Sequence, residues 1–374
     1  MKPGGYGRVL LFAPVPPPYG GMALQAGQLH RNLLEDGVEA DLFAANFPLP
    51  GWLRQAERVP GLRTALRFLL IWPKLWRAAG PCEVVHILAA SWEYFFLAVY
   101  PAVLVGRLRR KRLVVNYRGG DARRFFRWFG WAATPVLRMA DRITAPSRFV
   151  AEALTSRFGV AVDLVPNLVN TRRFRFRRRE ALRPKLLVTR HLEKIYDVAT
   201  AIRAFRAIER AHPDAALWIA GAGTEEAALR ALAADLEGVR FLGRVDHAEL
   251  PAIYDQCDIL LNTSTVDNFP GSLLEASAAG LAIVSTDAGG IPFLYEHGRS
   301  ALLVRPGDAE AAAAAVEDLL RLPGLAAALT GEAAEIARSC EWEQVRRRLY
   351  RSYGWEQRAA GQPDGTNATI LRLP

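Results

Sequence analysis

Two acidic side chains lie eight positions apart around the expected start of a helix. Asp267 follows the apolar run Ile259–Asn262, and Glu275 follows Pro270, a residue suited to the first turn of a helix. A helix amino terminus has unpaired N–H groups and a partial positive charge, so it can bind phosphate or hydroxyl oxygens. Asp267 and Glu275 could therefore face such a ligand. The alternative is that Asp267 or Asn268 merely caps the helix and Glu275 is a surface acid.

The elements that must position these residues alternate between apolar runs typical of buried strands and longer helical patterns. In the first half the runs lie at Arg8–Ala13, Asp41–Ala45, Val84–Ala89, Leu113–Tyr117, Arg142–Ala145 and Asp163–Val165. In the second half they lie at Leu186–Thr189, Leu217–Ala220, Val239–Leu242, Ile259–Asn262, Ile283–Ser285 and Ala301–Val304. Such alternation predicts an α/β protein with parallel sheets covered by helices on both faces.

The 374 residues are too many for one ordinary core. The segment Pro166–Pro184, with its basic run Arg172–Arg179, interrupts the alternation and is interpreted as the interdomain connection. We expect Rossmann-like domains at 1–168 and 183–340, facing each other across a cleft that binds the ligand. A helix at about 341–358 is expected to pack back on the first domain, and residues 361–374 to form a flexible tail.

Composition excludes several classes. Three cysteines, Cys82, Cys257 and Cys340, without a CxxC pair or a clustered set of histidines, argue against a disulfide framework or a structural zinc site. No leader segment is evident at the amino end, and the apolar stretches Leu62–Trp76 and Tyr94–Gly106 are too interrupted or too short to span a bilayer. These features favour a reducing, cytoplasmic location.

Charge is distributed unevenly. Residues 1–180 contain 28 Lys and Arg against 12 Asp and Glu, a balance of +16, whereas the remainder has a balance of −6. There are three basic runs, Arg107–Arg112, Arg123–Arg127 and Arg172–Arg179, and they carry aromatic residues between them, notably Phe125, Phe126, Trp128, Phe129 and Trp131. No nucleic-acid-binding motif accompanies them, so the mixture favours docking on an anionic lipid surface, at the inner face of the plasma membrane. Solvated faces combined with core aromatics are the alternative.

Several segments resemble, in order, the retaining GT-B glycosyltransferases of glycosyltransferase family 4 (glycosyl transferases group 1). Asp267 and Glu275 have the separation of that family's acid–seven–acid motif. The resemblance also includes Ala140–Ser147, Pro166–Asn170, Ile219–Gly223, Val239–Val245, Ala278–Pro292 and Gly298–Asp308. It implies the GT-B fold and retaining, metal-independent hexosyl transfer from a UDP- or GDP-sugar to a saccharide or lipid-linked acceptor in cell-envelope or exopolysaccharide synthesis. It implies no cofactor beyond this co-substrate, and no metal.

The resemblance also implies roles for residues of the second domain. Glu275 would bind the ribose hydroxyls of the donor. Asp267, which stands where the family usually has Glu, would face the donor sugar, and the N–H groups of Asn268 and Phe269 would bind sugar or phosphate oxygens. Gly243 and Arg244 are assigned to the donor site as well.

A cation after the first strand of that domain is also expected. Arg190 matches the family arginine that stabilises the departing diphosphate. The family usually adds a lysine five residues later. Here Lys194 falls four residues on, so Lys194 is the candidate and Tyr196 the alternative.

In the first domain, Gly20 and Gly21 match a glycine loop near the diphosphate and acceptor, where a side chain would block close approach. Arg118 stands where many members carry a histidine beside the donor sugar, and it could bind an anionic acceptor or donor group. His86 matches the first histidine of another family motif, although a structural role for a lone histidine on a buried strand is favoured.

Three other classes of protein explain these residues less well. The pair Gly221 and Gly223 is too weak for a dinucleotide-binding fingerprint, because residue 226 is Glu226 rather than glycine. A nucleotide-sugar epimerase would share the scaffold but leave Asp267 and Glu275 unexplained. A non-catalytic sugar-binding protein would normally be exported.

Overall fold

The computed structural model describes residues 6–17, 20–179 and 181–355. They form two compact units: one extends to Leu168 and resumes at Val345, and the other comprises Val169–Gln344. The tail predicted at 361–374 lies outside the described residues, as do Pro18, Tyr19 and the last part of the helix predicted at 341–358.

The first unit contains a parallel sheet in the order β2-β1-β3-β4-β5-β6. Its strands are β1 (Val9–Ala13), β2 (Ala40–Ala44), β3 (Val84–Ala89), β4 (Arg112–Tyr117), β5 (Arg142–Ala145) and β6 (Val162–Leu164). Each strand predicted for this half is therefore present, and each of its ends lies within one residue of the predicted end. The strands are short and apolar because helices cover both faces of the sheet.

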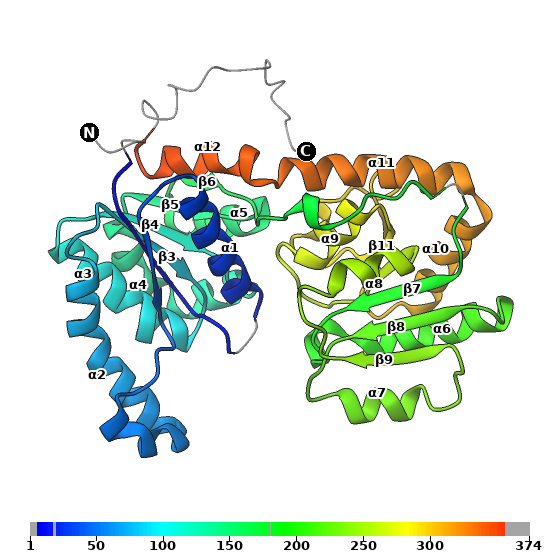
Figure 1. Cartoon of the computed structure of the whole chain (residues 1–374), viewed down its shortest axis with the longest axis horizontal. Helices are drawn as coiled ribbons and strands as arrows, with labels where there is room; N and C mark the ends of the chain where they lie inside the picture. Colours follow the sequence, from blue (N-terminus) through cyan, green and yellow to red (C-terminus); the bar gives the residue numbers. More distant parts are fainter. Residues whose placement is uncertain (1–5, 18–19, 180, 356–374) are drawn as a thin grey trace. The chain divides into compact units, whose positions relative to one another are not determined.

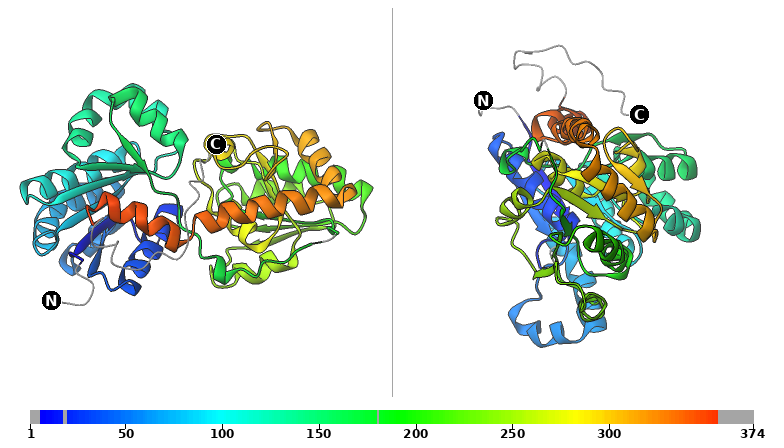
Figure 2. Two further views of the ribbon diagram at one scale, coloured as in Figure 1. Left: turned by 90° about the horizontal axis from the view of Figure 1, so that it is seen from above. Right: turned by 90° about the vertical axis from the view of Figure 1, so that its right-hand side faces the viewer.

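Helices of the first unit form two layers (Figures 1 and 2). They are α1 (Gly21–Glu35), α2 (Pro60–Ala78), α3 (Tyr100–Leu108), α4 (Ala122–Met139) and α5 (Arg148–Phe158), with short turns η1 (Gly51–Arg58) and η2 (Phe95–Val99). The helices α2 to α5 pack on one face, and α1 packs on the other. Gly37, at φ +76°, follows the end of α1, where a left-handed backbone favours glycine. In the described ranges, no helix combines the length and apolarity needed to cross a bilayer.

The last helix, α12 (Trp342–Ser352), returns to the first unit. The Tyr350 hydroxyl donates to Asp36 Oδ2 at 2.6 Å, and the Tyr353 hydroxyl lies 2.6 Å from His86 Nδ1. Burial, followed by the charge of Arg118, lowers the pKa of His86 to about 3, so its ring is neutral at physiological pH. These contacts support the structural interpretation of His86.

The second unit contains a parallel sheet in the order β12-β11-β10-β7-β8-β9. Its strands are β7 (Lys185–Thr189), β8 (Ala216–Ala220), β9 (Val239–Gly243), β10 (Ile259–Asn262), β11 (Ala282–Thr286) and β12 (Leu302–Val304). These again agree with the predicted strands within one residue at either end. The sheet's central pair, β7 and β10, comes from distant parts of the sequence.

Two helix layers also cover this second sheet (Figure 1). Its helices are α6 (Val198–Ala211), α7 (Glu226–Leu232), α8 (Leu250–Gln256), α9 (Gly271–Ala279), α10 (Ala309–Arg321) and α11 (Pro323–Ser339), with turns η3 (Thr171–Arg173), η4 (Lys194–Tyr196) and η5 (Ile291–Phe293). One core contains residues of α6, α7 and α10, the other contains residues of α8 and α9, and α11 contributes to both. The side chains of successive strand residues alternate between these two cores.

The basic run Arg172–Arg179 is partly packed inside the second unit rather than being only a connection. Asp258, buried at the start of β10, accepts hydrogen bonds from Arg177, Arg179 and Arg183 at 2.6 to 2.9 Å. Burial alone would raise the pKa of Asp258, but these hydrogen bonds outweigh it and lower the pKa below its usual range. Arg177 and Arg179 are thus engaged by an internal carboxylate, which corrects the view of the whole run as a lipid-facing or solvated surface.

Replacing this carboxylate provides the first test. Asp258→Asn keeps the shape but leaves buried guanidinium charge uncompensated, so we expect the free energy of unfolding to fall by about 3–5 kcal/mol. Urea titration followed by tryptophan fluorescence measures the change. Because the pKa of Asp258 is lower in the folded protein than in the unfolded chain, its ionised carboxylate stabilises the fold at every pH above the unfolded pKa. That stabilisation is lost as the pH falls below about 4. The wild type, but not the variant, should therefore show this loss.

The matched control is Asp255→Asn. The carboxylate of Asp255 is 44% exposed and lies 3.6 Å from Arg177 Nε, so its removal should cost less than about 1 kcal/mol. Equal losses in the two variants would contradict the special role of the buried carboxylate.

Candidate functional site

Arg190 and Asp267 meet at the carboxyl edge of the second sheet. Arg190 follows β7, and its Nη2 lies 2.7 Å from Oδ2 of Asp267, in the loop after the neighbouring strand β10. Its Nε donates to Oδ1 of Asn262, the last residue of β10, at 3.0 Å. Both charged side chains are 13% exposed, so the guanidinium is held in one orientation but remains accessible. Adjacent parallel strands end at the same edge, which is why these distant residues meet.

Two glycines after β11 fix the backbone of the Asp267 loop. Gly290 N donates to the Asp267 carbonyl at 2.7 Å. A Cβ at Gly289, which has φ +59°, would lie 2.1 Å from the Asp267 carbonyl oxygen, and one at Gly290 would lie 2.0 Å from the Asn268 carbonyl oxygen. Our sequence analysis included these glycines only within the resemblance at Ala278–Pro292. A Gly-Gly pair separated by two residues from a buried strand was the available signal for this close approach.

The loop that carries Lys194 and Tyr196 is attached to the same strand end. Thr263 Oγ1 donates to the Asp197 carbonyl at 2.8 Å, and Thr265 N donates to the Ile195 carbonyl at 2.9 Å. The Tyr196 ring lies beside the Arg190 guanidinium, 5.4 Å from ring centroid to Cζ, whereas the Lys194 side chain is exposed. The structure thus places the tyrosine against the arginine and the lysine outside it.

Glu275 lies on α9 with its carboxylate held at both oxygens. Its Oε2 accepts a hydrogen bond from the Tyr254 hydroxyl at 3.0 Å, and its Oε1 lies 3.2 Å from His247 Nε2. Burial, followed by the Glu275 charge, raises the pKa of Tyr254 well above its ordinary value, so this phenol keeps its proton. Glu275 is 16% exposed, which leaves part of the carboxylate accessible. His247 was missed by our sequence analysis, because its contact with α9 is long-range.

The remaining predicted residues of the second unit surround this edge. Asn268 and Phe269 are buried directly before α9, which begins at Gly271 with Pro270 as its N-cap. Gly243 ends β9 at φ +66°, and the exposed Arg244 follows it.

Gly221 and Gly223 have a packing role. A Cβ at Gly221 would lie 1.8 Å from the Arg190 carbonyl oxygen, and one at Gly223 would lie 2.3 Å from the Leu192 carbonyl oxygen. Close approach of two chain segments therefore explains the Gly-x-Gly spacing without a dinucleotide, and it supports the backbone of Arg190.

Three predicted site residues lie in the first unit. Gly20 and Gly21 begin α1, and a Cβ at either would meet no described atom within 4 Å, so contacts among the described residues do not require glycine there. Arg118 follows β4 and donates through Nη2 to Asn167 Oδ1. Burial lowers the pKa of Arg118 to about 10, which still leaves it charged at neutral pH. Among the described residues, His, Cys, Asp and Glu form no group of three suited to a metal ion.

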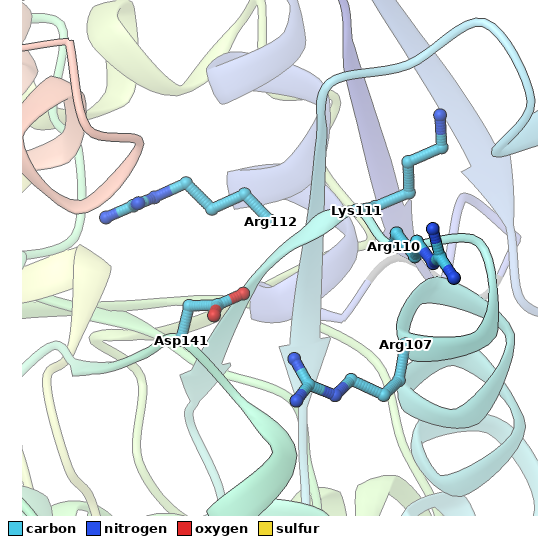
Figure 3. Close-up of a pocket in the computed structure, with 5 residues that line it drawn as sticks. All are labelled: Arg107, Arg110, Lys111, Arg112 and Asp141. Carbon is cyan, nitrogen blue, oxygen red and sulfur yellow. The ribbon is translucent and has the colours of Figure 1, made fainter.

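A separate cationic cavity of about 470 Å³ lies at the amino edge of the first unit's sheet (Figure 3). It is lined by Arg107, Arg110, Lys111, Arg112 and Asp141, around the start of β4. Arg118 follows the carboxyl end of β4, and Gly20 and Gly21 lie in the connection from β1 to α1, so this cavity is at the opposite edge of the first unit's sheet from these predicted site residues.

The two parallel six-stranded sheets match the GT-B fold of solved glycosyltransferase structures. The solved structure of Anabaena HepE in complex with UDP and glucose matches with a TM-score of 0.71 at 17% identity, covering 93% of this chain and 100% of that one. Sucrose-phosphate synthase from Thermosynechococcus elongatus matches with the same TM-score at 19% identity, covering 95% of this chain and 100% of the other. These similarities establish the fold.

Sequence comparison establishes the family. Residues 19–173 match the profile described as Glycosyltransferase Family 4, and residues 183–321 match that described as Glycosyl transferases group 1. A GDP-mannose-dependent alpha-(1-6)-phosphatidylinositol monomannoside mannosyltransferase from Mycolicibacterium smegmatis is 31% identical over 278 residues, covering 65% of this chain and 70% of that protein. Glycogen synthase from Mycobacterium tuberculosis is 27% identical over 298 residues, covering 75% and 70%. The chain belongs to this glycosyltransferase family, whose members transfer sugar from nucleotide sugars; the epimerase and binding-protein alternatives are set aside.

The glycine contacts at the Asp267 loop can be tested directly. In Gly290→Ala the new methyl group overlaps the Asn268 carbonyl, so the loop must shift, and we expect a stability loss of about 1–3 kcal/mol. We also expect transferase activity to fall under conditions where the variant remains folded. Gly331→Ala, at an exposed position of α11 where a Cβ meets nothing within 4 Å, is the control and should be neutral or slightly stabilising. Unaltered stability and activity in Gly290→Ala would contradict this role.

Proposed function

We propose that the chain transfers a hexose, with retention and without a metal ion, from a UDP- or GDP-sugar to a saccharide or lipid-linked acceptor in cell-envelope or exopolysaccharide synthesis. The observation that carries this proposal is the convergence of Arg190, Asp267 and Glu275 at the carboxyl edge of one sheet. Ligands of open α/β sheets bind outside this edge. Retention and metal independence are inferred from the family.

Arg190 is suited to stabilise the diphosphate that leaves the sugar. Asn262 and Asp267 orient its guanidinium before any ligand binds, so little reorganisation is needed when negative charge develops on the leaving group. We assign Lys194 as the second cation, since its exposed, flexible side chain can extend toward a phosphate.

Glu275 is suited to bind the ribose of the nucleotide. A carboxylate has about four lone-pair sites. Tyr254 makes one contact to Oε2 of Glu275, and His247 makes one contact to Oε1. The lone pairs that remain can accept from two adjacent hydroxyl groups. The backbone N–H groups of Asn268 and Phe269 and the amino end of α9 would bind sugar or phosphate oxygens, and Asp267 would face the donor sugar. Gly243 and Arg244 complete the donor side.

The first unit is proposed to serve the acceptor side. Gly20 and Gly21 leave room for close approach of the diphosphate and acceptor, and Arg118 supplies a charge for an anionic group. The similarity to a phosphatidylinositol monomannoside mannosyltransferase supports a lipid-linked acceptor, and the similarity to a glycogen synthase supports a saccharide acceptor.

Two substitutions test the donor site. Arg190→Ala and Glu275→Ala each remove a charged hydrogen-bonding group, so each should weaken UDP or GDP binding or lower turnover by about 10- to 100-fold, corresponding to about 1.5–3 kcal/mol. Calorimetric binding and sugar-transfer assays measure these effects, and wild-type transfer should persist in EDTA. The control is Arg230→Ala on α7, whose side chain is 51% exposed. Unchanged binding and transfer in both site variants would refute the assignment, and metal-reversible loss of wild-type activity in EDTA would refute metal independence.

We further propose that the first unit docks on an anionic membrane surface through α4. Phe125 and Phe126 are buried in the core, but Trp128 and Trp131 are 63% and 77% exposed. Arg124 and Arg127 are exposed as well. Arg124 lies one turn before Trp128, so this cation and this ring share a face of the helix, whereas Trp131 follows a break in the helical backbone at Phe129. Such a face is suited to the interface of an anionic bilayer.

Removing the two exposed rings tests this docking surface. The double variant Trp128→Ala and Trp131→Ala should bind anionic vesicles several-fold less than the wild type, and wild-type binding should weaken with salt because attraction is screened over about 8–10 Å at physiological ionic strength. Flotation with neutral and phosphatidylserine-containing vesicles measures both effects. Trp52→Ala removes a tryptophan that is 80% exposed on η1 and is the control. Absence of wild-type binding to anionic vesicles at low salt would exclude the proposal.

A further inference from the structure

A chain of contacts links the start of the second unit to Glu275. Arg173 lies in η3, close to Val169, where this unit begins, and His247 lies in the loop between β9 and α8. The guanidinium of Arg173 contacts His247 at two atoms: Nη1 meets the ring Nδ1, and Nη2 donates to the main-chain carbonyl oxygen. On the other side of the ring, Nε2 lies 3.2 Å from Glu275 Oε1.

The contact with Arg173 determines which ring nitrogen of His247 carries the hydrogen. A guanidinium has only donors, so Nδ1 of His247 must act as the acceptor and carries no hydrogen. The ring hydrogen is then on Nε2, where it can be donated to the Glu275 carboxylate. Arg173 therefore fixes both the position of the ring and the direction of its hydrogen bond.

The other oxygen of Glu275 is fixed separately. The Tyr254 hydroxyl, buried under α9, donates to Oε2 and also lies 2.9 Å from Thr189 Oγ1 at the end of β7. Tyr254 approaches the carboxylate from the core, whereas His247 is 40% exposed and approaches from the outside. Removing His247 would leave one oxygen of Glu275 without this donor and free to rotate about the Tyr254 contact.

An isolated pair at such an exposed position would contribute little. Here Arg173 contacts His247 twice, at the ring Nδ1 and at the main-chain carbonyl oxygen. These contacts immobilise the residue in advance, so they lower the entropic cost of its pairing with Glu275. The geometry is that of a donor held in advance for a functional carboxylate.

We propose that His247, held by Arg173, is a positioning residue that orients the Glu275 carboxylate toward the ribose hydroxyl groups of the donor nucleotide. The proposal rests on the ribose-binding role proposed above for Glu275. It predicts that changes at His247 and Arg173 affect recognition of the ribose hydroxyls specifically, rather than recognition of the base or the diphosphate.

Paired nucleotides separate these effects. UDP and GDP are each compared with their 2′,3′-dideoxy counterparts by calorimetric titration of the full-length protein, and the diphosphate that the wild type binds more tightly is used for all variants. The variants are Glu275→Gln, His247→Phe, Arg173→Met and His247→Gln. The glutamine amide can supply a donor near the position of Nε2, so His247→Gln is the conservative variant.

We expect His247→Phe and Arg173→Met to weaken binding of the ribonucleotide by about threefold to tenfold, the range for loss of one hydrogen bond, and to leave binding of the dideoxynucleotide unchanged. His247→Gln should retain most of the wild-type affinity for the ribonucleotide. Equal losses for both nucleotides would indicate a general structural effect and overturn the proposal, as would no loss for either.

Failure of the underlying function gives a different result. Suppose that Glu275→Gln weakens binding of the ribonucleotide but not of the dideoxynucleotide, whereas His247→Phe shows no such difference. Only the positioning role of His247 is then overturned. If the wild type binds neither diphosphate, or if Glu275→Gln affects both nucleotides equally, the ribose-binding role of Glu275 is overturned together with it.

Discussion

The buried charge of Asp258 is the constraint on which the second unit most depends. Its carboxylate, at the start of β10, binds the side chains of Arg177 and Arg179 and both the side chain and the main-chain N–H of Arg183, just before β7. A buried carboxylate cannot lose these donors without a large cost in free energy. It therefore fixes the two central strands to each other at their amino ends. At their other ends, the same two strands carry Arg190 and Asn262, whose hydrogen bond depends on that alignment.

Close contacts between main-chain segments position the loops at the carboxyl edge of the second sheet. Gly221 lies against the Arg190 carbonyl, and Gly289 and Gly290 lie against the carbonyls of Asp267 and Asn268. At each place a side chain would occupy the space of a neighbouring main-chain oxygen. The charged groups of the site are thus carried on backbone that has little freedom to move, which is what electrostatic stabilisation of a leaving group requires.

Local patterns were sufficient to predict the strands and the helix after Pro270, because apolar runs and turn residues are local signals. The partners of Asp258 and the contact of Arg173 with His247 could not be predicted, because each joins segments more than 70 residues apart. A charged residue's sequence neighbours do not reveal whether it is solvated or paired. In the first part of α4, however, helical spacing could have separated the buried Phe125 and Phe126 from the exposed Trp128. Trp131 lies beyond a break in the helical backbone at Phe129, which that spacing does not predict.

The division of the chain into units also changes how its charge should be counted. The arginines of Arg172–Arg179 belong to the second unit, which between residues 169 and 344 has a balance of −5. Residues 1–168 still contain 22 basic against 11 acidic residues. Residues 345–355, which include most of α12, add four arginines and no acid. One of these, Arg346, pairs with Asp36. The positive charge is therefore a property of the first unit itself rather than of the connection between units. Attraction to an anionic surface would act on the unit that carries the exposed tryptophans of α4 and the cationic cavity at Arg107.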